Sequence, residues 1–176
     1  MKGMDMAALE WSDGLALDLP LMDDTHQEFV QLLEAVERAD DAHLLDAWKA
    51  LVEHTEGHFG QEDRWMQATR FASSNCHSLQ HKVVLQVMRE GTQRAEQGEL
   101  GVLRGMASEL AIWFPQHTQS MDAALALHLR RAGFDLETGI VNAPAALPDE
   151  LIQGCGGACS SGDDEHAAHE RQPVAA

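Results

Sequence analysis

The chain has 176 residues, enough for one domain of ordinary size and a tail. Its 12 Lys and Arg stand against 29 Asp and Glu, and the resulting formal charge of −17 excludes nucleic acid and anionic membrane surfaces as expected partners. No run of about 18 apolar residues occurs, the N-terminus lacks the apolar stretch of a secretory signal, and three cysteines cannot form a disulfide framework, so we expect a cytoplasmic protein.

The predicted fold class is all-α, because apolar residues recur at spacings of three and four in four stretches and almost no stretch alternates with period two. Residues 1–20 are predicted to form an irregular N-terminal arm, with Trp11 and Leu15 covering one side of the core. Residues 21–132 contain the four amphipathic stretches. Their connections are short, which favours antiparallel neighbours, so we predict an up-down-up-down antiparallel four-helix bundle.

Polar residues mark the predicted helix ends. The N-terminal caps, in chain order, are expected at Asp23 or Asp24, at Asp40-Asp41 and at Ser73 or Ser74. The third helix is expected to end near Gly98 and the fourth at Gly133, since glycine adopts the left-handed conformation that closes a helix.

Residues 133–176 differ in composition and are predicted to form a flexible acidic tail. Within them Cys155 and Cys159 are followed by His166 and His169, a spacing that resembles a metal clip. The surrounding glycines and acidic residues favour disorder over that clip.

Several predicted inner helical faces carry polar side chains where a bundle would place Leu. A buried His or carboxylate without a partner costs several kcal/mol, so a ligand must compensate for them. Counting residues from the predicted turns places these side chains at a similar depth on all four helices. The candidate metal ligands are His26, His58, Glu62, His77, His81, His117 and Asp122.

The number and spacing of these ligands favour two metal ions. Five imidazoles and two carboxylates exceed the four ligands of one zinc, and imidazole with carboxylate suits iron. A spacing of four places two ligands on one helical face. The step of five from His117 to Asp122 is less regular, and Pro115 is expected to supply the local distortion that aligns them.

Other histidines are assigned other positions. His54 lies off the ligand face of its helix and is predicted to be an outer partner of a ligand or partly exposed, while His43 and His128 are predicted to lie on the surface.

The ordered ligand set resembles the hemerythrin family, specifically its bacterial single-domain members. The resemblance runs from Trp11 to about Arg131. It rests on Leu9-Glu10-Trp11, Asp24-Thr25-His26, His58-Phe59-Gly60-Gln61-Glu62, His77-Ser78-Leu79-Gln80-His81 and Trp113-Phe114-Pro115-Gln116-His117, followed by Asp122.

This resemblance implies a non-haem di-iron centre with an oxo or hydroxo bridge. One iron would be held by His77, His81 and His117, the other by His26 and His58, and Glu62 and Asp122 would bridge both. Dioxygen would bind end-on at the open position of the second iron. The residues expected around it are Phe29, Trp113, Phe114 and Thr118. At the last two positions the family commonly has Leu and Ile, so Phe114 narrows the pocket and a Thr118 hydroxyl facing the site would admit water.

The expected function is reversible dioxygen binding by a monomeric carrier, store or sensor that is not an enzyme. A di-iron oxidase, peroxidase or nitric-oxide-handling enzyme on the same site is the alternative. A second alternative is an interaction module that senses oxygen. The sequence does not indicate a partner for the tail.

Overall fold

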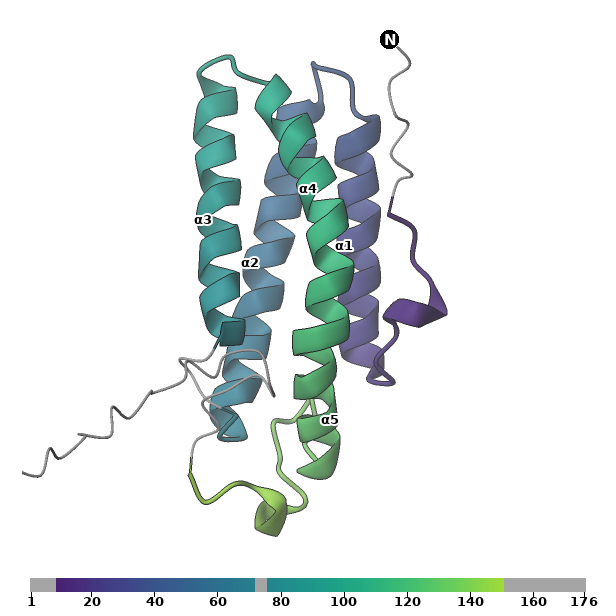
Figure 1. Cartoon of the computed structure of the whole chain (residues 1–176), viewed down its shortest axis with the longest axis vertical. Helices are drawn as coiled ribbons and strands as arrows, with labels where there is room; N and C mark the ends of the chain where they lie inside the picture. Colours follow the sequence, from purple (N-terminus) through teal and green to yellow (C-terminus); the bar gives the residue numbers. More distant parts are fainter. Residues whose placement is uncertain (1–8, 72–75, 151–176) are drawn as a thin grey trace, which may run out of the picture.

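The computed structural model describes residues 9–71 and 76–150. The described residues form an all-α four-helix bundle and contain no named strand (Figure 1). The long helices are α1 (Pro20–Arg38), α2 (Leu44–Ala68), α3 (Cys76–Glu96) and α4 (Gly101–His117). In sequence order each packs against the next, and α1 closes the bundle against α4, so neighbours in the chain are neighbours in space.

Shorter elements extend these helices. A π-helical turn, η2 (Thr118–Asp122), and α5 (Ala123–Arg131) continue α4, so the predicted fourth helix exists but is interrupted. Short 3-10 helices lie before α1 (η1, Asp13–Leu15) and after α5 (η3, Pro144–Ala146). No described helix combines the length and apolarity needed to span a bilayer.

The first helix begins earlier than its predicted cap. Pro20 occupies the first turn of α1, where its missing N–H has no helical partner to lose. Asp23 lies inside the helix, and its carboxylate accepts hydrogen bonds from the backbone N–H groups of Leu17 (2.7 Å) and Leu19 (3.3 Å). The prediction that Asp23 or Asp24 is the N-cap was therefore wrong, because the carboxylate reaches back to stabilise the entering chain.

The other predicted helix ends had mixed outcomes. Asp40 lies in the turn before α2, where its carboxylate accepts from the backbone N–H of His43 (3.0 Å), and α2 begins only at Leu44. Gly98 (φ +100°) and Gly133 (φ +57°) adopt the left-handed conformation after α3 and α5, as predicted. Ser73 and Ser74 lie outside the described residues.

The apolar core is divided into two clusters along the bundle axis. The larger lies between the halves of the helices near the α1–α2 and α3–α4 turns and contains Phe29, Leu33, Trp48, Met88 and Phe114. The smaller lies at the opposite end and contains Met22, Trp65, Leu125, Leu129 and Phe134. Buried polar residues occupy the level between them. On α1, for example, His26 lies between Met22 and Phe29.

Within the described part of the predicted arm, Trp11 and Leu15 cover the bundle as expected. Leu15 is buried, and Trp11 packs against the larger apolar cluster. Gln119 of the π turn donates to the carbonyl of Gly14 (3.4 Å), which attaches this arm to the end of α4.

The prediction of a flexible tail from residue 133 onwards was wrong for residues 133–150, which pack on the end of the bundle. Phe134 is buried, and Val141 and Leu147 pack against the smaller cluster. Backbone bonds from Asn142 to Gly133 (3.0 Å) and from Ala143 to Ala132 (3.0 Å) close this segment into a hairpin-like loop. The apolar residues of this segment do not recur at helical spacing, so their role in the core is visible only from their contacts in the folded structure. Cys155, Cys159, His166 and His169, for which disorder was predicted in preference to a metal clip, lie outside the described residues.

We predict that a chain ending at Ala132 is less stable than one ending at Glu150. Loss of Phe134 alone removes burial worth about 1.5–3 kcal/mol, and the shorter chain also uncovers Leu129. Thermal unfolding followed by circular dichroism measures the difference in Tm between these two truncations, with the full chain as reference. Equal Tm values for all three chains would show that residues 133–150 contribute nothing to stability.

Candidate metal centre

The seven candidate ligands come together at the level between the two apolar clusters, although they come from four helices and the π turn. All are buried, and the side chains of His26, Glu62, His77 and Asp122 have no exposed surface. Two overlapping groups of donor atoms result, each with its atoms within 4.8 Å of one another. One contains Glu62, His77, His81, His117 and Asp122, and the other contains His26, His58 and Glu62.

The π turn explains how Asp122 reaches the site. On an ideal α-helix a step of five residues rotates a side chain by about 140° relative to the first one. The wider turn over Thr118–Asp122 removes most of that rotation, and Asp122 Oδ1 lies 3.1 Å from His117 Nε2. Pro115 lies within α4 just before this turn, and the expected local distortion is present in this region.

Each carboxylate divides its two oxygens between the two groups of histidines. Glu62 Oε1 lies 3.1 Å from His58 Nε2 and 3.7 Å from His26 Nε2, whereas Glu62 Oε2 lies 3.3 Å from the Nε2 atoms of both His77 and His81. This is the arrangement that a carboxylate needs in order to bridge two cations.

Asp122 divides its oxygens in the same way. Its Oδ1 lies 2.9 Å from His77 Nε2 and 3.1 Å from His117 Nε2, while its Oδ2 lies 3.2 Å from His26 Nε2. Both carboxylates therefore connect the group with three histidines to the group with two.

The donor atoms are placed to bind a cation rather than to form hydrogen bonds with one another. Nε2 of His26, Nε2 of His77, Oε2 of Glu62 and both carboxylate oxygens of Asp122 are buried 2.9–3.3 Å from one another, yet none of them makes a well-aligned hydrogen bond. Nε2 of His81 and Nε2 of His117 lie 3.3 Å apart. Because buried polar atoms are normally paired, this convergence of lone pairs indicates a metal site.

The electrostatics of the cluster also favour bound positive charge. Burial lowers the pKa of His26 and His77, but interactions with Asp122 and Glu62 outweigh it and raise these pKa values to about 9 and about 10. Burial raises the pKa of Glu62, yet the nearby histidines, His58 foremost, hold it well below its usual range. The two carboxylates therefore stay ionised and retain positive charge beside them, which a metal cation supplies in place of protons.

Outer contacts orient two histidines of the three-histidine group. Nδ1 of His81 donates to the carboxylate of Asp63 (3.3 Å), and Nδ1 of His117 donates to the side-chain oxygen of Gln80 (3.2 Å). The same Gln80 oxygen accepts from the indole N–H of Trp113 (3.3 Å). With the proton on Nδ1, each imidazole presents the lone pair of Nε2 to the cluster, as metal ligation requires.

Aromatic rings pack around the same histidines. Phe59 stacks on His81 with ring centroids 3.9 Å apart, and Trp113 stacks on His117 at 4.5 Å. The prediction that Trp113 lies beside the two-histidine group therefore differs from the structure, because its ring packs on the three-histidine side.

Two of the other predicted pocket residues, Phe29 and Phe114, lie on the side of the two-histidine group. Phe114 contacts His26 edge to face at 5.4 Å, and Phe29 stacks on Phe114 at 4.2 Å. Thr118 is fully buried, and its hydroxyl has no hydrogen-bond partner.

Sequence reasoning missed Phe59, Asp63 and Gln80 as parts of the site. Each adjoins a ligand in the chain, since Phe59 follows His58, Asp63 follows Glu62 and Gln80 precedes His81. The depth count that aligned the ligands would also have placed Asp63 level with His81, each roughly nine residues from the α2–α3 turn.

The other histidines within residues 9–71 and 76–150 lie outside the cluster. His54 is half-buried, with Nε2 3.1 Å from the carbonyl of Thr25, and His43 is exposed beside Asp40. The prediction of a surface His128 was wrong, because this ring is half-buried against Phe71 and its Nε2 lies 2.9 Å from the carbonyl of Thr69.

We predict that Gln80→Leu accelerates metal release about tenfold to hundredfold, because it removes the acceptor that holds His117 and Trp113. The rate of transfer of bound metal to a chelator measures this effect. Gln86→Leu, an exposed change on the same helix, serves as the control and is expected to release metal at the wild-type rate. Equal rates for both variants would contradict an orienting role for Gln80.

A helical bundle that buries two overlapping groups of imidazole and carboxylate donors defines a metal-binding protein. The family model of the hemerythrin HHE cation binding domain matches residues 17–127. A bacteriohemerythrin of Ralstonia nicotianae is 37% identical over 130 residues, which cover 74% of this chain and 95% of that protein. The chain belongs to the hemerythrin family.

More distant relatives bear the same name. Bacteriohemerythrins of Pseudomonas aeruginosa and Stenotrophomonas maltophilia are 27% and 24% identical over 124 and 128 residues. These matches cover 67% and 69% of this chain and 79% and 81% of the two relatives. No solved structure matches the chain.

Proposed function

We propose that the chain holds two iron ions and binds dioxygen reversibly, as a carrier, store or sensor. The observation that carries this proposal is the division of each carboxylate, Glu62 and Asp122, between the two groups of histidines. Mixed imidazole and carboxylate donors suit iron, and carboxylates that bridge keep two ions together as a pair. When bound in the ferrous state, such a pair supplies the two electrons that dioxygen takes up.

Dioxygen is expected at the side of His26 and His58. Counting Asp122 Oδ2, this side has four protein donors, against five on the side of His77, His81 and His117. The smaller donor set leaves room for an added ligand. Phe29 and Phe114 lie beside His26 without exposed surface, so they exclude water from that position.

The same surroundings favour binding over turnover. Phe29 and Phe114 carry no acid or base that could transfer a proton to a bound ligand. The chain contains no Tyr, so a tyrosyl group cannot pass an electron or proton onward. We therefore propose that the protein is not an enzyme. Its monomeric state and cytoplasmic location stay predictions from the sequence.

The decisive experiment loads the protein with iron, reduces it without oxygen and then admits air. We expect two irons per chain by elemental analysis and a visible absorption band that appears with air and disappears when oxygen is withdrawn. His58→Ala should abolish the band. Continuous oxygen consumption in the presence of a reductant, faster than spontaneous oxidation, would replace the carrier proposal with the oxidase alternative. One metal per chain, or zinc in preference to iron, would overturn the di-iron assignment.

We predict that Thr118→Val slows spontaneous oxidation of the oxygenated protein. The substitution keeps the shape of a fully buried side chain and removes its unpaired hydroxyl, which is the group able to hold a water molecule beside His117. Loss of that unpaired hydroxyl should also stabilise the fold by about 1 kcal/mol. Decay of the visible band measures oxidation, and urea unfolding measures stability. Faster decay in Thr118→Val would show that the hydroxyl protects the site.

A further inference from the structure

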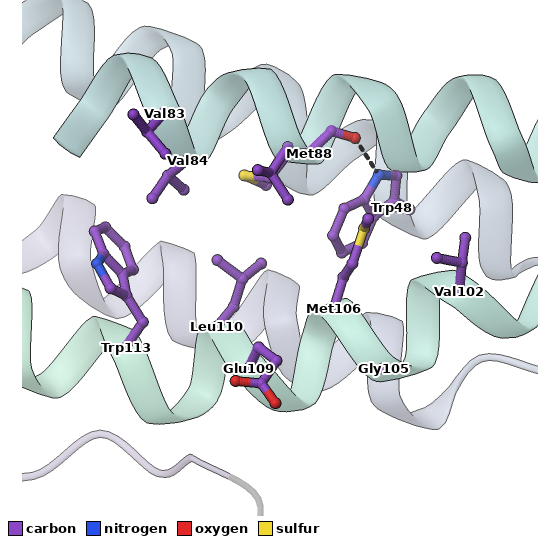
Figure 2. Close-up of a pocket in the computed structure, with 11 residues that line it drawn as sticks. Trp48, Val83, Val84, Met88, Val102, Gly105, Met106, Glu109, Leu110 and Trp113 are labelled. Carbon is purple, nitrogen blue, oxygen red and sulfur yellow. Dashed lines mark hydrogen bonds between the residues drawn. The ribbon is translucent and has the colours of Figure 1, made fainter. Parts of the chain in front are cut away.

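An apolar groove lies between α3 and α4, outside the metal cluster. Its volume is about 520 Å³, within the range of roughly 300–1,000 Å³ for small-molecule sites. Figure 2 shows Trp113 at one end, Trp48 and Met106 towards the other, and Val84, Met88 and Leu110 between them.

The floor of the groove is buried and its rim is exposed. Trp48 and Met88 are buried, and the indole N–H of Trp48 donates to the carbonyl of Met88 (3.2 Å, Figure 2). Val83 and Val87 on α3 form the rim, with 53% and 45% of their surfaces exposed. Exposed branched apolar residues beside a cavity are a feature of many binding surfaces.

One charged residue, Glu109, lines the groove, and its negative charge favours a cationic ligand. Glu109 is exposed on α4, and no Lys or Arg is among the lining residues. No ion pair involves Glu109 within residues 9–71 and 76–150. The partly exposed indole ring of Trp113 adds a face that attracts cations. An apolar slot with one accessible indole and one unpaired carboxylate is complementary to a flat apolar body that carries one positive charge.

We propose that this groove binds a small aromatic ammonium ion, with its ring system against Trp113 and the apolar side chains of α3 and α4 and its ammonium group at Glu109. Binding in this groove does not require the proposed oxygen chemistry. Only one side chain separates the groove from the candidate ligands, because Trp113 lines the groove and also stacks on His117 at 4.5 Å. A ligand that contacts Trp113 is therefore coupled to the orientation of His117 through the shared Gln80 oxygen.

Isothermal titration calorimetry with three probes of one shape tests the site: 2-naphthylmethylammonium, the uncharged 2-naphthylmethanol and the anionic 2-naphthoate. We expect the cation to bind about tenfold more tightly than the alcohol, and the anion not to bind. Glu109→Gln should remove the preference for the cation. Glu53→Gln removes the same charge from an exposed position on α2 and should change nothing.

A blocking variant tests the location. An added Cβ at Gly105 meets no atom within 4 Å, so Gly105→Trp places a bulky side chain at the lining without a backbone clash. We expect this variant to fold, as judged by circular dichroism, and to lose binding of the cation. Retained binding in Gly105→Trp, or equal affinity for the three probes, would overturn the proposal. The coupling is tested by zinc release from zinc-loaded protein, which the cation should alter in the wild type and leave unaltered in Gly105→Trp. An unaltered rate in the wild type would overturn it.

Discussion

Glu62→Ala is expected to lose metal from both positions, whereas His26→Ala is expected to lose it from one. Glu62 offers Oε1 to His58 and Oε2 to His77 and His81, so its removal takes a ligand and a negative charge from both groups. Without the negative charge of Glu62 between them, two bound cations repel each other more strongly and are released together. Metal content after anaerobic loading and dialysis, measured by elemental analysis, should fall towards zero in Glu62→Ala and towards one ion in His26→Ala.

Two further variants separate ligand loss from misfolding. Glu62→Gln keeps the volume of the side chain but replaces one oxygen by an amide nitrogen that cannot ligate, so it should also lose metal while retaining its helical circular dichroism. Glu56→Ala changes an exposed glutamate of α2 that bonds Arg89 (2.8 Å), and it should load as the wild type does. Full metal content in Glu62→Gln would show that Glu62 does not bridge.

Phe114→Ala is expected to cost about 3–5 kcal/mol of unfolding free energy, the usual range for truncating a buried aromatic ring. Phe114 has no exposed surface, stacks on Phe29 and contacts the edge of His26, so its loss opens a cavity next to a ligand. Water that enters this cavity should also hasten spontaneous oxidation of the iron-loaded protein. Urea unfolding and the decay of the visible band measure the two effects.

One control changes Phe114 itself to a smaller apolar residue, and the other changes an exposed residue on the same helix. Phe114→Leu retains most of the apolar volume and should show smaller losses in both measurements. Ile112→Ala changes a residue with 48% of its surface exposed and should stay within about 0.5 kcal/mol of the wild type. An unchanged oxidation rate in Phe114→Ala would show that this ring does not exclude water from the site.

The helices and the convergence of the seven candidate ligands were predictable because both depend on local geometry. An α-helix repeats every 3.6 residues, so the positions of Leu33, Trp48 and Leu110 identify the buried faces without knowledge of their neighbours. His58 and Glu62 share a face for the same reason, and counting from the turns brought His26, His77 and His117 to one level. Only the step to Asp122 needed a distortion, and its form, a π turn, was not predictable from spacing.

Tertiary structure alone decided what depends on how the helices rotate and pack against one another. Helical periodicity places Trp113 and Gln80 on their own helices, but the contact that joins both to His117 arises from the packing of α3 on α4. The same packing leaves an apolar groove lined by Val83 and Trp113. Phe134, in a segment without helical periodicity, is buried because the end of the bundle presents an apolar surface to it. Contacts between segments distant in the chain carry no local signature, so the fold was needed to find them.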